Sequence, residues 1–141
     1  MTQLLFNRDD ELAQWAENKY PDCAPLSRPL TSIGIASSEG KILGVAIYHN
    51  FRQNDVEITF ITTTPRWATL GNIKALLYYP FIQLGVQRMT AITKKSNKQA
   101  RKFLSGIGFL LEGTHPYAAN GKTACTYGLY SDNAKKRWLH G

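Results

Sequence analysis

The middle of this chain lacks acidic side chains: between Glu57 and Glu112 there is neither aspartate nor glutamate. The same stretch carries eight cationic residues, namely Arg66, Lys74, Arg88, Lys94, Lys95, Lys98, Arg101 and Lys102. The whole chain of 141 residues has 17 Lys and Arg against 10 Asp and Glu, a net charge of +7. Because the excess lies in one stretch, it predicts a discrete, phosphate-rich ligand, whereas a nucleic acid is possible but not favoured.

Other absences narrow the class of protein. Cys23 and Cys125 are too few to staple a small secreted fold, and no Cys/His cluster has metal-ligand spacing. The N-terminus shows no signal-peptide pattern, and the longest apolar region, 75–86, is too short and interrupted to span a bilayer. We therefore expect a cytoplasmic protein with no metal site and no membrane partner, either a monomer or a homodimer. Since no repeat or linker is present, residues 1–141 are expected to form a single domain.

Hydrophobic periodicity and turn signals predict a mixed α/β chain. The first half predicts a strand at Leu4–Phe6, a helix from Asp9 or Asp10 to Lys19, an irregular arm at Cys23–Leu30 that includes Pro25, a hairpin of Ser32–Ser37 with Ile42–His49, and a strand at Val56–Thr62. The second half predicts a helix at Asn72–Leu84 with a kink or early stop at Pro80, a strand at Met89–Thr93, a helix that Asn97 caps and Gly106 or Gly108 ends, and a strand pair of Phe109–Leu111 and Ala124–Tyr130 around an Asn120-Gly121 turn.

The segment Pro65–Asn72 joins a predicted strand to the start of a predicted helix. Such loops present successive backbone N–H groups and the positive end of the helix dipole, which together bind phosphate. Gly71 would let a phosphate approach the backbone closely. On the loop alone, an ordinary turn glycine and a solvated Arg66 are an equally good interpretation.

Together with a run further along the chain, this loop resembles the GCN5-related N-acetyltransferase (GNAT) family. Arg66, Thr69 and Gly71 fit the family spacing of Arg or Gln, two residues, Gly, one residue, Gly or Ala, with Thr69 departing from the first Gly. The family's second run is matched by Asn97, Ala100, Phe103, Leu104, Gly108, Phe109, Glu112 and Gly113. Residues 65–91 are similar to a subgroup found in bacteriophages and prophages, and the resemblance as a whole covers about 40–130.

The resemblance implies an α+β fold with a central, mostly antiparallel twisted sheet flanked by helices, in which strands splay after the fourth. It implies acetyl-CoA as co-substrate, with its pantetheine arm on the main chain of Phe60, Ile61 and Thr62. The pyrophosphate would be surrounded by Arg66, Trp67, Thr69, Leu70, Gly71 and Asn72. Asn97 matches a cofactor-contacting Asn, and Lys98 or Arg101 would reach the adenosine phosphates. Plain helix capping by Asn97 and a solvated helix face for the two cations are the alternatives.

Acyl transfer to an amine needs a group that takes a proton from the amine. Strand alternation predicts Val56, Ile58 and Phe60 on one face and Glu57, Thr59 and Ile61 on the other. Glu57 resembles the general-base glutamate of some family members, and no other carboxylate follows before Glu112. The alternative is a glutamate held by a cross-strand cation. His49 and His115 are weaker candidates.

Phe103 occupies the position at which many family members have a tyrosine that protonates the leaving thiolate. Either the thiolate leaves without a strong acid, or Tyr117, Tyr127 or Tyr130 substitutes, or the enzyme is degenerate; Tyr117 is our candidate acid. Two functions follow. The favoured one is an acetyl-CoA-dependent N-acetyltransferase acting on an amine of a protein or small molecule. The other is a non-catalytic binding module or virion-associated protein that contacts anionic partners.

Overall fold

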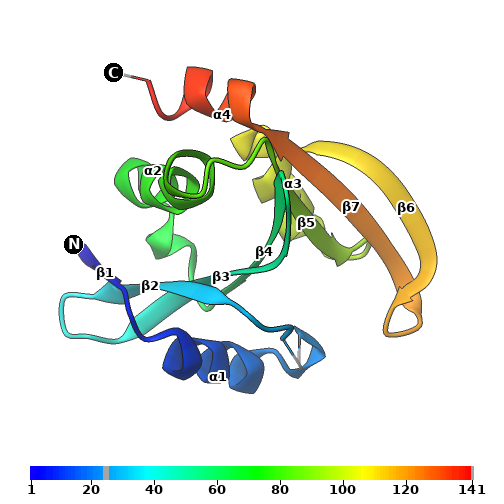
Figure 1. Cartoon of the computed structure of the whole chain (residues 1–141). Helices are drawn as coiled ribbons and strands as arrows, with labels where there is room; N and C mark the ends of the chain where they lie inside the picture. Colours follow the sequence, from blue (N-terminus) through cyan, green and yellow to red (C-terminus); the bar gives the residue numbers. More distant parts are fainter. Residues whose placement is uncertain (24–25, 141) are drawn as a thin grey trace.

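Seven strands form one sheet around which the chain is organised (Figure 1). The structure, a computed structural model, describes residues 1–23 and 26–140. The strands are β1 (Thr2–Leu5), β2 (Thr31–Ser37), β3 (Ile42–Arg52), β4 (Asp55–Thr62), β5 (Arg88–Lys94), β6 (Leu110–Ala119) and β7 (Lys122–Tyr130). Their order across the sheet is β1-β2-β3-β4-β5-β7-β6, and only β4 and β5 are parallel among these neighbours. The expected mixed α/β architecture with a mostly antiparallel sheet is confirmed.

Helices cover both faces of the sheet. They are α1 (Asp9–Lys19), α2 (Leu70–Tyr78), α3 (Lys98–Ile107) and α4 (Ser131–Arg137), with short turns η1 (Pro21–Cys23), η2 (Pro65–Trp67) and η3 (Tyr79–Gln83). Leu12 and Ala16 of α1 pack on Val45 and Ile47 of β3, whereas a larger cluster buries α2 and α3 against the opposite face (Figure 1). None of the helices in residues 1–23 and 26–140 combines the length and the apolarity needed to cross a membrane.

The two hydrophobic clusters confirm the predicted alternation along β4. Ile58 and Phe60 pack with the α2 and α3 cluster, and Ile61 packs with the α1 cluster. Glu57, one pleat position away from Ile58, therefore lies on the α1 face of the sheet.

β4 and β5 separate halfway along their length, as the resemblance implied. β4 pairs with β5 only over Asp55–Ile58 and Arg88–Ala91. Beyond this segment β4 stays paired to β3 as far as Thr62, and β5 stays paired to β7 as far as Lys94. The sheet thus opens between its two halves while each half keeps its own ladder.

The predicted kink or early stop of the Asn72–Leu84 helix at Pro80 is confirmed: α2 ends at Tyr78 and the π-type turn η3 follows, because Pro80 lacks the amide that would continue the α-helical ladder. The helix begins earlier than predicted, at Leu70. Helix α4 was not predicted: its sequence is polar and buries only Ala134. Tertiary bonds hold it, since Trp138 Nε1 donates to Ile107 O (2.8 Å) and Arg137 Nη2 donates to Gly106 O (2.6 Å).

The last strand pair is longer than predicted. β6 extends to Ala119 with most side chains exposed, so the sequence shows little apolar alternation there. Asn120 and Gly121 form the predicted turn with φ values of 50° and 82°. The first strand also starts earlier than predicted, at Thr2. Cys23, the first residue of the arm that was predicted to be irregular or a short helical turn, ends the 3₁₀ turn Pro21–Cys23, and Pro25 lies outside the described residues.

Candidate active site at the strand splay

A cleft of about 900 Å³ occupies the region where β4 and β5 separate. Its lining comes from β4, β5, α2 and α3, from the arm after α1, and from the tip of the β6–β7 hairpin. In Figure 1 this hairpin curves toward the side of the sheet that carries α1. The volume lies within the range of about 300–1,000 Å³ that small-molecule and cofactor sites usually have.

The separation leaves one edge of β4 without a strand partner. Thr63 N donates to Leu43 O (3.0 Å), so Thr63 points its main-chain groups toward β3. Because these directions alternate along a strand, Ile61 also faces β3, whereas Phe60 and Thr62 face the gap. Of the three residues expected to contact the ligand through their main chain, Ile61 therefore points its N–H and C=O groups toward β3. Phe60 and Thr62 point theirs toward the gap. Such an edge can pair with an extended ligand.

The loop before α2 ends in free amides. Thr69 caps the helix, with its Oγ1 accepting from Asn72 N (3.2 Å). In the described part of the chain, the amides of Leu70 and Gly71 have no acceptor. A Cβ placed on Gly71 would meet no atom within 4 Å, so the space above these amides is open. Together with the helix dipole, two open N–H groups suit an anion such as phosphate.

Trp67 and Asn72 support this loop from below. The Trp67 ring is 4% exposed and lies between Phe60 and Phe103, with centroid distances of 4.3 and 4.9 Å. Asn72 is 7% exposed, and its Nδ2 donates to Trp67 O (2.7 Å) and to Thr2 Oγ1 (2.9 Å). Both side chains are engaged in the protein interior, and Trp67 also lines the cleft whereas Asn72 does not, so the expectation that the two surround a pyrophosphate stays a prediction.

The two residues of the α3 segment that were expected to contact the cofactor, Asn97 and Arg101, lie differently with respect to the cleft. Asn97 lines the cleft while its Oδ1 accepts from Ala100 N (3.1 Å), so it caps the helix. Arg101 does not line the cleft; its Nε donates to Tyr127 Oη (2.9 Å) and its Nη1 to Lys95 O (3.2 Å). The structure therefore does not bring Arg101 to the site.

Several of the cations in the carboxylate-free stretch have partners inside the protein. Lys94 Nζ lies 2.6 Å from Asp22 Oδ2, and Arg88 pairs with Glu112 and Asp55. The excess positive charge is therefore smaller than the sequence suggested. Within residues 1–23 and 26–140, six cations of this stretch form no ion pair: Arg66, Lys74, Lys95, Lys98, Arg101 and Lys102.

Glu57 lies on the α1 side of the cleft and is 20% exposed. Its Oε1 accepts from Asn50 Nδ2 (3.0 Å), and its Oε2 lies 3.7 Å from His49 Nε2. No lysine or arginine in the described ranges pairs with Glu57; its cross-strand partner is His49, which is a cation only when protonated. Burial lowers the pKa of His49 below its ordinary value of 6.5, and the charge of Glu57 partly opposes this shift.

Four residues around Glu57 were missed or underrated: Ser27, His49, Asn50 and Thr59. At the turn between β3 and β4, Arg52 pairs with Asp55. If this register continued along the two strands, Asn50 would lie opposite Glu57. An irregularity between His49 and Arg52 brings His49 opposite Glu57 instead. The bulge carries no side-chain pattern that sequence periodicity can detect.

None of the three tyrosines proposed as acid lines the cleft. Tyr117 is 82% exposed with a φ of 63°, and it lies on the outer part of the hairpin. Tyr127 Oη accepts from Arg101, and Tyr130 Oη donates to Glu112. The structure thus gives no support to Tyr117 as the proton donor.

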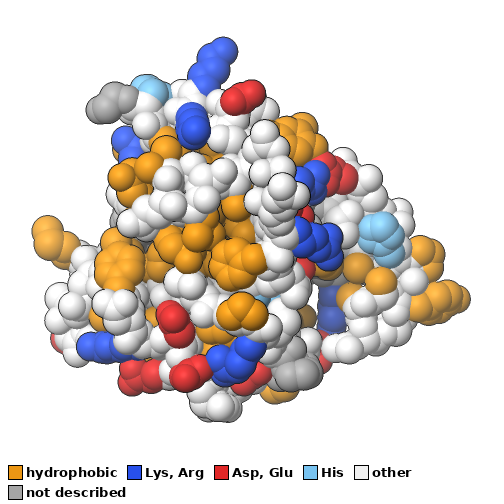
Figure 2. All heavy atoms as spheres, viewed as in Figure 1, with side chains coloured by type: hydrophobic (Ala, Val, Ile, Leu, Met, Phe, Trp, Pro, Cys, Tyr) orange, Lys and Arg blue, Asp and Glu red, His pale blue; other side chains and the backbone are white. Residues whose placement is uncertain are grey.

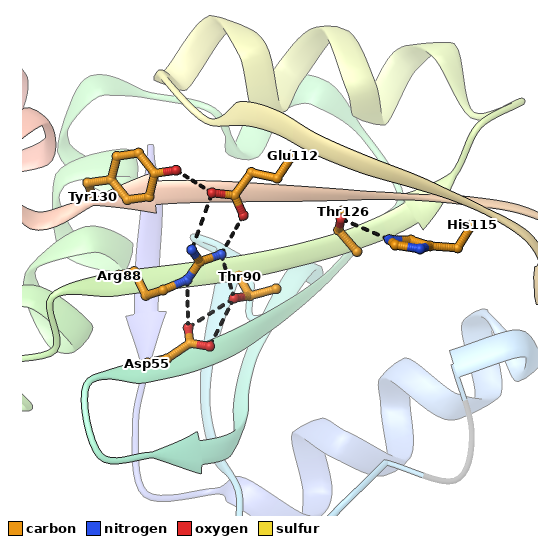
Figure 3. Close-up of polar contacts among 7 residues, drawn as sticks. All are labelled: Asp55, Arg88, Thr90, Glu112, His115, Thr126 and Tyr130. Carbon is orange, nitrogen blue, oxygen red and sulfur yellow. Dashed lines mark hydrogen bonds and ion pairs between the residues drawn. The ribbon is translucent and has the colours of Figure 1, made fainter.

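A polar network connects the strands at the end of the splay where β4 and β5 are still paired (Figure 3). Arg88 Nη2 and Nη1 donate to the Glu112 carboxylate at 2.6 and 3.2 Å, and Arg88 Nε lies 3.6 Å from Asp55 Oδ1. Thr90 Oγ1 donates to Asp55, and Tyr130 Oη donates to Glu112. The bonds from Arg88 and Tyr130 hold the pKa of Glu112 below its ordinary value. Side chains of β4, β5, β6 and β7 are thereby tied together just where β4 and β5 are still paired.

A second hollow, of about 480 Å³, lies away from the splay between α2 and the C-terminal tail. Figure 2 shows hydrophobic side chains gathered on this face, and Tyr78, Tyr79 and Trp138 are among its lining residues. It has no carboxylate in its lining. The splay cleft, which is lined by an open strand edge and Glu57 and reaches Ala68 beside the free amides of α2, is therefore the candidate active site.

Solved structures with the same fold are acetyltransferases by name. The spermidine/spermine N-acetyltransferase SpeG from Vibrio cholerae is similar with a TM-score of 0.77 and 11% identity, covering 97% of this chain and 99% of that one. The ribosomal-protein-S5-alanine acetyltransferase from Vibrio fischeri gives a TM-score of 0.72 and 14% identity, covering 97% and 94%. A GNAT-family acetyltransferase from Bacillus anthracis gives 0.60 and 16%, covering 72% and 66%.

No protein-family model matches the sequence, and no curated protein gives a significant match. At identities this low, the structural similarity shows the fold alone. The chain therefore has the acyl-CoA N-acyltransferase fold of these proteins, and its chemistry must be argued from its own site.

Proposed function

We propose that this chain is an N-acetyltransferase that transfers the acetyl group of acetyl-CoA directly to an amine. One observation carries the proposal: the open β4 edge and the carboxylate of Glu57 line one cleft, and Ala68 and Ile73 of its lining flank the free amides at the start of α2. The edge suits an extended arm, the amides suit phosphate, and the carboxylate suits a cationic amine.

The fit to acetyl-CoA rests on the shape and donors of the cleft. The main chain of Phe60 and Thr62 would pair with the amide-containing pantetheine arm. The amides of Leu70 and Gly71 would hold the pyrophosphate, with Arg66 and the Thr69 cap at the same helix end. Asn97 and the start of α3 border the opposite wall of the cleft. Among the unpaired cations, Lys98 is the one we assign to the adenosine phosphates in place of Arg101.

Acetyl-CoA supplies an activated thioester, and the protein supplies proton transfer and positioning. Glu57 takes a proton from the acceptor ammonium, directly or through one water, and so makes the nitrogen nucleophilic. The released thiol has a pKa near that of cysteine, about 8.5, so a thiolate can leave without a strong acid. Tyr20 is the one tyrosine of the described residues in the cleft lining, and its ring lies beside Lys94 Nζ. Tyr117, Tyr127 and Tyr130 do not line the cleft, and we therefore assign no side chain as general acid.

The acceptor is inferred from the charge of the cleft. Asp22 also lines the cleft but pairs with Lys94, so Glu57 is the carboxylate of the lining without a Lys or Arg partner. An amine in its ammonium form complements that charge. The similar structures are named for acetylation of spermidine or spermine, which are amines, and of an alanine of a ribosomal protein.

The alternative is a binding module on the same fold with little or no catalysis. Phe103 favours it, because its ring packs on Trp67 and brings no hydroxyl to the cleft. A cytoplasmic location, a single domain over residues 1–141, a monomer or homodimer, and a bacteriophage origin stay predictions from the sequence.

A direct assay separates the two functions. The protein would be incubated with acetyl-CoA and a panel of amines: spermidine, a peptide with N-terminal alanine, and a lysine peptide with blocked ends. We expect release of free thiol and a product heavier by one acetyl group with at least one of them. Binding of acetyl-CoA without transfer to any panel amine or to fractionated cell extract would favour the binding module.

A further inference from the structure

Glu57 and four polar side chains around it form one connected group, which we call the His49 cluster: Ser27, His49, Asn50, Glu57 and Thr59. Ser27 Oγ lies 2.7 Å from His49 Nδ1 and donates to Asn50 Oδ1 (2.7 Å). His49 Nε2 lies 2.8 Å from Thr59 Oγ1 and 3.7 Å from Glu57 Oε2. Asn50 Nδ2 closes the group by donating to Glu57 Oε1 (3.0 Å). The cluster joins the arm after α1 to strands β3 and β4.

The hydrogens of this cluster can be placed by elimination. A carboxylate only accepts, so Asn50 must turn its NH₂ group to Glu57 and its oxygen to Ser27. Ser27 has a single hydroxyl hydrogen, and Asn50 Oδ1 takes it. Ser27 Oγ must then accept from His49, which requires a hydrogen on Nδ1. Neutral His49 consequently has a bare Nε2, which accepts from the Thr59 hydroxyl and faces Glu57.

Two further observations indicate that contacts within the protein fix this arrangement. His49 is 5% exposed, so its tautomer is set by protein partners and not by water. Asn50 adopts the left-handed region with φ 51°, a conformation that costs free energy and persists where surrounding contacts enforce it. That conformation is what allows one amide side chain to reach both Ser27 and Glu57.

We propose that Glu57 and His49 form a proton-sharing pair, in which His49 Nε2 receives the proton that Glu57 removes from the acceptor amine. The proposal rests on the proposed function. His49 does not touch the acceptor; it acts through Glu57 and is therefore a positioning residue. Glu57 is the titratable group that faces His49 from the described elements packed around it.

The protons balance as follows. The acceptor ammonium loses a proton to the Glu57 carboxylate. The Thr59 hydroxyl rotates from donor to acceptor and so frees the lone pair of His49 Nε2. Glu57 Oε2, which lies 3.7 Å from Nε2, then moves to hydrogen-bond distance and passes the proton on, which leaves Glu57 ionised beside an imidazolium. The nitrogen–acetyl bond forms as the carbon–sulfur bond breaks, the second amine proton goes with the thiolate, and His49 later releases its proton to solvent through Glu57. Ser27 keeps its hydrogen on Asn50 throughout, so it is not a nucleophile.

Nuclear magnetic resonance of ¹⁵N-histidine protein without ligand tests the pair independently of activity. We expect His49 to show a protonated Nδ1 and a bare Nε2 at neutral pH. In Ser27→Ala, we expect neutral His49 to be a mixture of its two tautomers. Glu57→Gln should lower the pKa of His49, because the carboxylate that favours the imidazolium is gone, and should leave the signals of His115 unchanged. An Nε2–H tautomer in the wild type, or a His49 titration that ignores Glu57→Gln, would overturn the proposal.

Steady-state kinetics with an amine of the panel that is acetylated tests the proton transfer from Glu57 to His49, which we call the relay. His49→Gln keeps hydrogen-bonding atoms but cannot take a proton, and we expect kcat/KM at neutral pH to fall by about 10-fold or more. The acid limb of the pH profile should move to lower pH, since Glu57 alone then sets it, and His115→Gln should change neither quantity. An unchanged rate and unchanged acid limb in a folded His49→Gln protein would refute the relay. If no amine is acetylated, the proposed function fails, and the resonance experiment still decides whether the pair shares a proton.

Discussion

Replacing Gly128 with alanine should destabilise this protein, although alanine is usually the better residue inside a strand. Gly128 lies in β7 beneath the Glu112 carboxylate (Figure 3 shows Glu112). A Cβ at Gly128 would come within 2.7 Å of Glu112 Oε2 and 2.8 Å of Oε1 and Cδ. Because these atoms end a flexible side chain, the carboxylate would move and the backbone would stay. The bonds from Arg88 and Tyr130 to Glu112 would then be lost or lengthened.

The expected change in the free energy of unfolding for Gly128→Ala is the difference between two opposing contributions. Hydrogen bonds to a charged group contribute about 1.5–3 kcal/mol, and partial exposure of the pair, 33% for Arg88 and 27% for Glu112, reduces this toward about 2 kcal/mol. Glycine to alanine within a strand returns roughly 0.5–1 kcal/mol. We expect a net loss of about 1 kcal/mol in the free energy of unfolding, or about 3 °C in Tm.

Urea unfolding of a double-mutant cycle measures this coupling. In a Glu112→Ala background nothing is left to displace, so Gly128→Ala should be neutral or stabilising, and the coupling energy should be about 2 kcal/mol. Arg88 holds the pKa of Glu112 low, so this stabilisation is present above the unfolded carboxylate pKa and is lost as pH falls through the folded pKa. A Gly128→Ala protein that is more stable than wild type at neutral pH would refute the reasoning.

Three other outcomes concern the cleft. Gly71→Glu should abolish the stabilisation by acetyl-CoA, which for wild type is about 2.7 kcal/mol at a ligand concentration one hundred times Kd; an undiminished thermal shift would contradict the phosphate site. Glu57→Gln should lower kcat by about 100-fold or more and leave acetyl-CoA affinity nearly unchanged, whereas lower stability with full turnover per folded molecule would indicate a purely structural glutamate. Nucleic acid should bind weakly, lose affinity steeply with salt and compete with CoA, and Lys98→Ala should weaken both ligands; salt-resistant binding that ignores CoA would favour the binding module.

Much of the fold could be predicted because its signals are local. Alternation along β4 placed Phe60 and Glu57 on opposite faces, and the Asn120-Gly121 dipeptide marked the hairpin turn correctly. Helix α4 could not be predicted, since its stability comes from bonds between the C-terminal segment and α3 rather than from an apolar stripe.

The site was predicted less completely, because partners distant in the sequence decide what a side chain can reach. Arg101 resembles a phosphate ligand in the sequence but is engaged by Tyr127. Asn72 was expected beside a pyrophosphate but is tied to Thr2, which is 70 positions away. His49 became a neighbour of Glu57 only through a strand irregularity that leaves no pattern in the residue types.

Hydrogen exchange at β4 tests the central claim most directly. In the free protein the amide of Ile61 faces β3 and should exchange slowly, while the amide of Phe60 faces the gap and should exchange faster. If acetyl-CoA lies along the open edge of β4, saturating acetyl-CoA should slow exchange at Phe60 strongly and change Ile61 little. Unchanged exchange at Phe60 under saturating acetyl-CoA would contradict the account.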